Sequence, residues 1–136
     1  DLLATSQAEY DPRVASRIAA GEPSRAADYI QLFRDREEII AEATQLMAPF
    51  DAFIYPTVAL AAPTIEEAGA SDSAYVALNL KLLRNPGLVN ALDGCAASLP
   101  CHVPGEAPVG FSVAGMRGTD AHVLGVAQAI EAVLNK

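Results

Sequence analysis

A change of hydrophobic periodicity between residues 24 and 56 constrains the fold more than any other feature of the sequence. Across residues 24–47, apolar side chains recur at helical spacing, and Pro49 ends the pattern because the residue before a proline is pushed out of the helical region. Residues 52–55 then form a short apolar run that Pro56 stops. Such a run predicts a strand buried on both faces, as in the parallel part of an α/β sheet.

The other helical patterns are shorter and are separated by a long loop. Residues 10–21 predict a helix with a proline in its first turn. Ser73 can cap another helix that runs to about residue 83, where the sequence Asn85-Pro86-Gly87 breaks it. Residues 58–73 show no clear period, and a loop of this length is often functional or mobile.

Two more strands and a final helix complete the predicted fold. Residues 96–99 form a short apolar segment, and residues 109–114 alternate large and small side chains with the period of a strand. The large side chains would fill a core, and the small ones would let another segment pack close. Thr119 or Asp120 would cap the last helix. The order of these elements predicts an α/β or α+β fold in a single segment, residues 1–136.

The composition narrows the classes of molecule that the protein can bind and the cellular compartment in which it can reside. Acidic residues outnumber basic ones by 17 to 9, and the net charge of −8 argues against nucleic acid or an anionic membrane surface as a partner. Apolar stretches stop well short of the roughly 20 residues of a membrane-spanning helix. With two cysteines and no export signal, we expect a cytoplasmic protein. The chain begins at Asp1 without methionine, which suggests a piece of a longer polypeptide.

Residues 94–115 gather reactive side chains, but each has a structural explanation. Ser112 lies in the middle of an alternating strand, whereas a nucleophilic serine of the Gly-x-Ser-x-Gly type sits on a sharp turn into a helix. Cys95 and Cys101 lack the spacing of a zinc site, and we expect buried, reduced thiols. His102 follows Cys101 directly, and neighbours in an extended chain point to opposite faces. We predict no catalytic residue and no metal site in this chain.

The carboxylates at element boundaries have an equally simple explanation. Asp51, Asp93 and Asp120 each begin or end a predicted element, where capping accounts for them without catalysis.

Several segments together resemble the C-terminal portion of an amidase signature enzyme. They are, in order, DPRVASRIAAGE, DYIQLFRDREE, FDAFIYPT, RNPGLVNALDGCAASLP, PVGFSVAG and a closing IEAVL. The resemblance implies part of an α/β fold in which short strands of a mixed sheet are flanked by several helices. It also implies hydrolysis of an amide bond by a serine nucleophile, a second serine in a cis peptide and a lysine, without metal or other cofactor.

The resemblance implies that these three catalytic residues lie outside this chain. The family's lysine and Gly/Ser-rich signature precede the segments that match here, so this chain alone should be inactive and should contribute scaffold and pocket wall. In enzymes that it resembles, the loop after the Pro-Thr strand end borders the acyl pocket. Pro56, Thr57 and Val58 are therefore the candidate substrate-pocket residues, although a purely structural strand end explains them equally well.

The resemblance also sets the expected partners and leaves two alternatives open. We expect the chain to contact the N-terminal portion of the same enzyme and a small amide substrate. Apolar residues that face the absent portion should be exposed, which would favour a homo-oligomer of the isolated chain. One alternative is an ammonia-producing subunit of an amidotransferase. The other is a free-standing, non-catalytic α/β module that binds a ligand or partner.

Overall fold

The computed structural model describes residues 2–134 and contains two compact units, Asp1–Asp35 and Arg36–Lys136. The first unit contains α1 (Leu2–Ser6), a short 3-10 helix (Gln7–Glu9) and α2 (Pro12–Ala19). Asp11 caps α2, because its side chain accepts a 2.8 Å hydrogen bond from the backbone N–H of Arg13. The helix predicted around Pro12 is therefore confirmed.

The long helix predicted from the apolar period is α3 (Ala26–Met47), which begins in the first unit and ends in the second. None of its 22 residues is buried by the described chain. In its second half, Ile39 is 55% exposed and Leu46 is 72% exposed. The apolar side chains that define the helical pattern thus remain accessible.

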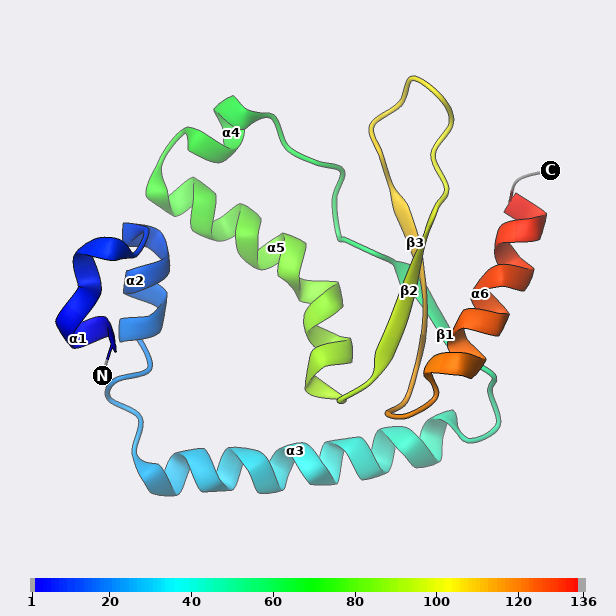
Figure 1. Ribbon diagram of the computed structural model, residues 1–136, viewed down its shortest axis with the longest axis horizontal. Helices are drawn as coiled ribbons and strands as arrows, with labels where there is room; N and C mark the ends of the chain where they lie inside the picture. Colours follow the sequence, from blue (N-terminus) through cyan, green and yellow to red (C-terminus); the bar gives the residue numbers. More distant parts are fainter. Residues whose placement is uncertain (1, 135–136) are drawn as a thin grey trace. The chain divides into compact units, whose positions relative to one another are not determined.

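The three strands form one antiparallel sheet in the order β1-β3-β2 (Figure 1). They are β1 (Phe53–Pro56), β2 (Cys95–Pro100) and β3 (Gly110–Gly115). The expectation of a parallel strand buried on both faces was wrong for β1, which lies at an edge and pairs antiparallel with β3. Because the last helix of the chain packs on β2 and β3, Ile54 of the edge strand is left 59% exposed.

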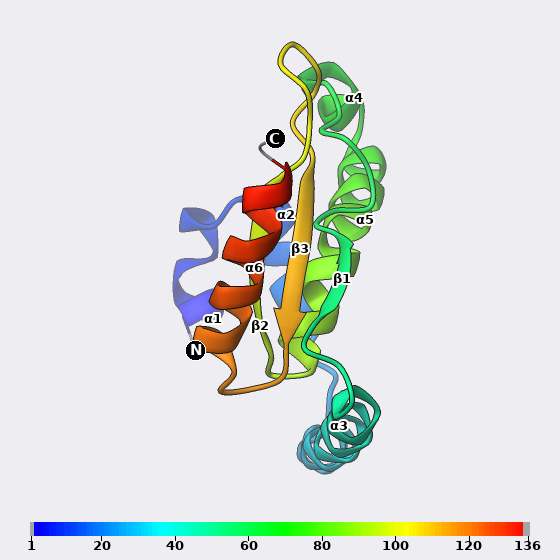
Figure 2. The same ribbon diagram turned by 90° about the vertical axis from the view of Figure 1, so that its right-hand side faces the viewer.

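The core of the second unit lies between this sheet and α6 (Asp120–Leu134). Figure 2 shows α6 on one side of the sheet and α5 (Asp72–Ala91) on the other. Leu99 and Val113 of the sheet pack against Val123 and Ala127 of α6. Phe111 and Val113 of β3 therefore fill a core, as their alternation predicted, whereas Val109 precedes β3 and is 39% exposed.

The segment between β1 and β2 contains more helix than expected. Residues 65–69, part of the predicted loop, form α4 (Ile65–Gly69). Thr64 and Glu67 cap it reciprocally: the Thr64 side chain accepts from the Glu67 N–H, and the Glu67 carboxylate accepts from the Thr64 N–H. This capping box stabilises a short helix in a segment whose apolar residues show no helical period.

Helix α5 also departs from the prediction at both ends. It is capped by Ser71 rather than Ser73, through a 3.1 Å bond from the Ala74 N–H. The predicted break at residues 85–87 was wrong, because the helix continues past Pro86 to Ala91. A proline removes one helical hydrogen bond, but Val89 and Leu92 beyond it are buried and hold the chain in place.

Asp93 ends α5 with backbone geometry rather than with its side chain. Its φ of 54° lies in the left-handed region, where the Asp93 N–H reaches the Asn90 carbonyl and the Gly94 N–H reaches the Val89 carbonyl. The carboxylate instead forms ion pairs with Arg36 at 3.5 Å and Arg117 at 3.3 Å. The expected side-chain capping role was therefore wrong for Asp93.

The predicted α/β class is confirmed as helices around a small antiparallel sheet within residues 2–134. The extent of the domain, residues 1–136, stays a prediction. Among the described residues, every helix is too short or too polar to span a lipid bilayer.

Candidate functional site

The small residues of β3 create a cavity on the sheet face opposite α6. Phe111 and Val113 point to the core, so Gly110, Ser112 and Ala114 point the other way, toward α5. A cavity of about 300 Å³ lies there. Its lining combines aromatic, aliphatic, amide and hydroxyl groups, from Tyr55, Thr57, Pro86, Val89, Asn90, Gly94, Ala96, Ser98 and Ser112.

Three hydroxyl groups from three separate segments converge in this cavity. Thr57 Oγ1 lies 2.6 Å from Ser98 Oγ and 2.8 Å from Ser112 Oγ. The Thr57 N–H donates to the Gly110 carbonyl at 2.8 Å, which fixes Thr57 beside β3 just after β1 ends. Ser98 and Ser112 are cross-strand partners, and such partners point to the same face of a sheet.

Gly110 permits this convergence because it has no side chain. A Cβ at this position would lie 2.5 Å from Ser98 Oγ and 2.7 Å from Thr57 Oγ1. The small face of β3 was predicted to let another segment pack close, and Thr57 is the residue that does so.

The three predicted pocket residues have different positions around this cavity. Thr57 lines it directly. The Pro56 carbonyl accepts a 2.7 Å hydrogen bond from Asn85 Nδ2 of α5, which anchors the end of β1 to that helix. Val58 is half-buried in the following turn and is not among the lining residues. A role for any of the three in substrate binding stays a prediction.

Sequence reasoning missed the contribution of Ser98 and the contact made by Asn85. Strand alternation placed Ser112 on the small face, but the register that puts Ser98 opposite it depends on pairing between strands. Asn85 lies in the predicted helix break, and the sequence predicted no contact for its side chain. No local pattern could have joined Asn85 to Pro56 or Ser98 to Thr57, because these contacts span 29 and 41 residues of sequence.

The cavity offers hydroxyl groups that can form hydrogen bonds with a ligand. A serine nucleophile needs an adjacent general base, and the partners recorded for Ser112 and Ser98 in residues 2–134 are hydroxyl groups. Hydroxyls both donate and accept, so they can orient a polar ligand. No group of three or more potential metal-ligating His, Cys, Asp or Glu side chains occurs within the described part of the chain.

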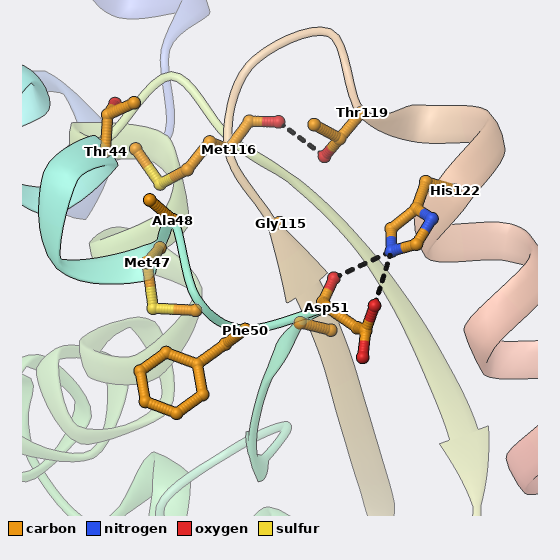
Figure 3. A pocket seen from close by; sticks show the side chains of 10 residues that line it. Thr44, Met47, Ala48, Phe50, Asp51, Gly115, Met116, Thr119 and His122 are labelled. Carbon is orange, nitrogen blue, oxygen red and sulfur yellow. Dashed lines mark hydrogen bonds and ion pairs between the residues drawn. The ribbon is translucent and has the colours of Figure 1, made fainter.

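A second cavity, of about 290 Å³, lies between the end of α3 and the start of α6 (Figure 3). His122 Nε2 lies 3.0 Å from the Asp51 carbonyl oxygen and 3.8 Å from Asp51 Oδ1. Met47 and Met116 supply much of the apolar lining, as Figure 3 shows. The exposed His122 and Asp51 tie the segment before β1 to α6, which is a structural role.

The two cysteines and the other histidine lie outside the hydroxyl-lined cavity, and Cys95 Sγ lies 3.5 Å from Thr119 Oγ1. Cys95 is half-buried, and its Sγ lies 3.8 Å from the Met116 carbonyl. Cys101 is exposed, so the expectation of burial was wrong for this thiol, which follows β2 in the loop before β3. His102 is exposed in the same loop.

The clearest departures from ordinary pKa values occur at helix starts outside these cavities. Arg25 donates to Asp28 and holds the pKa of that carboxyl below its usual value, while the Arg25 pKa is raised. Thr64 donates to Glu67 through its backbone and side chain, which lowers the Glu67 pKa. These carboxylates stabilise local structure.

Comparison with known proteins adds the family context to this geometry. The family model described as Amidase matches residues 2–124, a range that contains the whole hydroxyl-lined cavity. Over 127 residues, the chain is 27% identical to the 2-amino-5-chloromuconic acid deaminase of Comamonas testosteroni. The match covers 93% of this chain but 27% of that relative.

Proposed function

This chain belongs to the amidase family, and we propose that it forms the C-terminal portion of an enzyme that hydrolyses the carbon–nitrogen bond of a small amide. We expect the serine nucleophile, the second serine in a cis peptide and the lysine in a part of the polypeptide outside these 136 residues. This chain then contributes scaffold and pocket wall and is inactive alone. The observation that carries the proposal is the family match across residues 2–124.

The cavity supports a role in substrate positioning. Amide hydrolysis passes through an oxyanion that preorganised donors stabilise in a site shielded from water. A pocket wall contributes by holding the acyl group so that its carbonyl meets those donors and the nucleophile. Thr57, Ser98 and Ser112 form such a polar wall, with Tyr55 and Val89 as apolar neighbours.

Exposed apolar side chains support contact with the rest of the polypeptide. Ile39 and Leu46 of α3 are more than half exposed, as is Phe50, which is 63% exposed. Large exposed apolar side chains favour burial against another protein surface. We propose that the rest of the enzyme covers them and that the isolated chain forms homo-oligomers.

The relative's name favours a hydrolytic enzyme over the two alternatives. A deaminase removes an amino group, which agrees with cleavage of a carbon–nitrogen bond. An ammonia-producing amidotransferase subunit stays the second candidate, and a free-standing binding module the third. We also propose a cytoplasmic location, which the two free thiols support.

The test is an ammonia-release assay on the full-length protein with a panel of primary amides. We expect turnover, and we expect substitution of the proposed upstream serine by alanine to abolish it. The 136-residue chain alone should release no ammonia. Turnover that survives the serine substitution would contradict the mechanism, and ammonia production only in the presence of a second acceptor-binding subunit would favour the amidotransferase.

A further inference from the structure

The direction of the hydrogen bonds among the three hydroxyls follows from their burial. Ser112 is 2% exposed, and the partner of its hydroxyl in the described chain is Thr57 Oγ1 at 2.8 Å. A buried hydroxyl proton that meets no acceptor is costly, so the Ser112 proton points to Thr57. Thr57 thus accepts the first hydrogen bond of the chain.

Either oxygen of the Thr57–Ser98 pair can donate, but one arrangement gives the proton of the half-buried Thr57 an acceptor within the described chain. A threonine hydroxyl carries a single proton, which Thr57 directs to Ser98 Oγ at 2.6 Å. Ser98 accepts this bond and is itself exposed in the cavity. Its own proton is therefore available to a ligand, and the order of donation runs from Ser112 through Thr57 to Ser98.

We propose that Ser98 is a specificity residue that donates a hydrogen bond to a second acceptor atom on the acyl part of the amide substrate. Thr57 is a positioning residue that orients Ser98 and polarises its hydroxyl, since successive hydrogen bonds strengthen one another. The favoured ligands are small amides whose acyl group carries an additional carbonyl oxygen, carboxylate oxygen or ring nitrogen. This inference rests on the proposed amide hydrolysis.

Matched amide pairs test the inference on the full-length protein. Malonamide and nicotinamide carry a second acceptor, whereas butyramide and benzamide are matched amides without it. We expect kcat/KM to favour the acceptor-bearing member of at least one pair by about tenfold, the effect of one well-placed hydrogen bond. Ser98→Ala should abolish that preference by raising KM for the acceptor-bearing amide more than KM for its matched partner.

Three further variants separate positioning from general damage. Thr57→Val should weaken the preference in the same direction, and Thr57→Ser, which keeps the hydroxyl, should retain it. Ser24→Ala is the matched control, because Ser24 is an exposed serine in the other unit. A preference that survives Ser98→Ala, or the absence of any preference in the unmodified protein, overturns the assignment of Ser98.

Thermal unfolding tests the pairing of the buried Ser112 hydroxyl with Thr57 without any turnover. Thr57→Val removes the acceptor for the buried Ser112 proton, so the double variant with Ser112→Ala should melt at a higher temperature than Thr57→Val alone. A double variant that melts no higher overturns the pairing with which the chain of hydroxyls begins.

Binding distinguishes failure of this inference from failure of the proposed function. If no amide releases ammonia, the proposed function fails, and the same pairs are compared by saturation-transfer NMR. A binding preference that Ser98→Ala removes supports the donor role. Equal binding within each pair overturns it.

Discussion

The substitution Gly110→Ala would test the packing on which the hydroxyl cluster depends. The new Cβ would lie 2.5 Å from Ser98 Oγ, 2.7 Å from Thr57 Oγ1 and 3.1 Å from Thr57 Cβ. Both hydroxyls would have to move, and their 2.6 Å hydrogen bond would break. Overpacking together with one lost hydrogen bond predicts a local destabilisation of about 2–4 kcal/mol.

Hydrogen–deuterium exchange of the full-length protein measures this local cost directly. Peptides that contain β1 and β3 should exchange about 30-fold to 1,000-fold faster in the variant, since each 1.4 kcal/mol corresponds to a factor of ten. Gly125→Ala is the matched control, because a Cβ there meets nothing within 4 Å and lies in the interior of α6. It should leave β1 and β3 unchanged and stabilise the helix by about 0.5–1 kcal/mol. Unchanged exchange in Gly110→Ala would refute the role of Gly110 in the packing.

Three other predictions address the helix ends and the thiols. Asp93→Gly relieves the strain of the left-handed backbone but removes two ion pairs, so the free energy of unfolding should change by less than about 1 kcal/mol in denaturant titrations. Asp93→Ala removes the same ion pairs and keeps a Cβ in the left-handed region, so it should lower the free energy of unfolding by about 1–2 kcal/mol. The Glu67 carboxyl should titrate below 4.5 in an NMR pH titration. Because its folded-state pKa is lowered, its stabilisation of α4 is present above pH 4.5 and is lost as pH falls through the lowered pKa. Glu67→Gln should remove this pH dependence. Iodoacetamide should modify the exposed Cys101 before the half-buried Cys95, as peptide mass spectrometry would record, and equal rates would contradict the difference in accessibility.

Local patterns in the sequence predicted most of the helices and strands, because the side-chain period of an element is set by residues a few positions apart. The apolar period gave α3, and the alternation of residues 109–114 gave β3 and its core-facing side chains. The prediction failed where long-range packing overrides local preference, as at Pro86, which lies inside a helix that buried residues beyond it hold in place. The capping box of α4 is a local signal that was present and overlooked.

The candidate site was predictable only in part for a related reason. Thr57 came from family resemblance, and it lies in the cavity. Ser98 reaches the cavity through strand register, and Asn85 contacts Pro56 beside it through the placement of α5; both depend on residues distant in sequence. A short apolar run such as residues 52–55 cannot distinguish a central parallel strand from an antiparallel edge strand, since both need apolar side chains.

The strand order has a consequence for synthesis on the ribosome. The central strand, β3, is the last of the three to be translated, and both earlier strands pair with it rather than with each other. Neither β1 nor β2 can therefore pair with β3 until the residues of β3 have left the exit tunnel. During that interval β1 and β2 lack the partner that they share in this sheet, and exposed strand edges make growing polypeptides prone to aggregation.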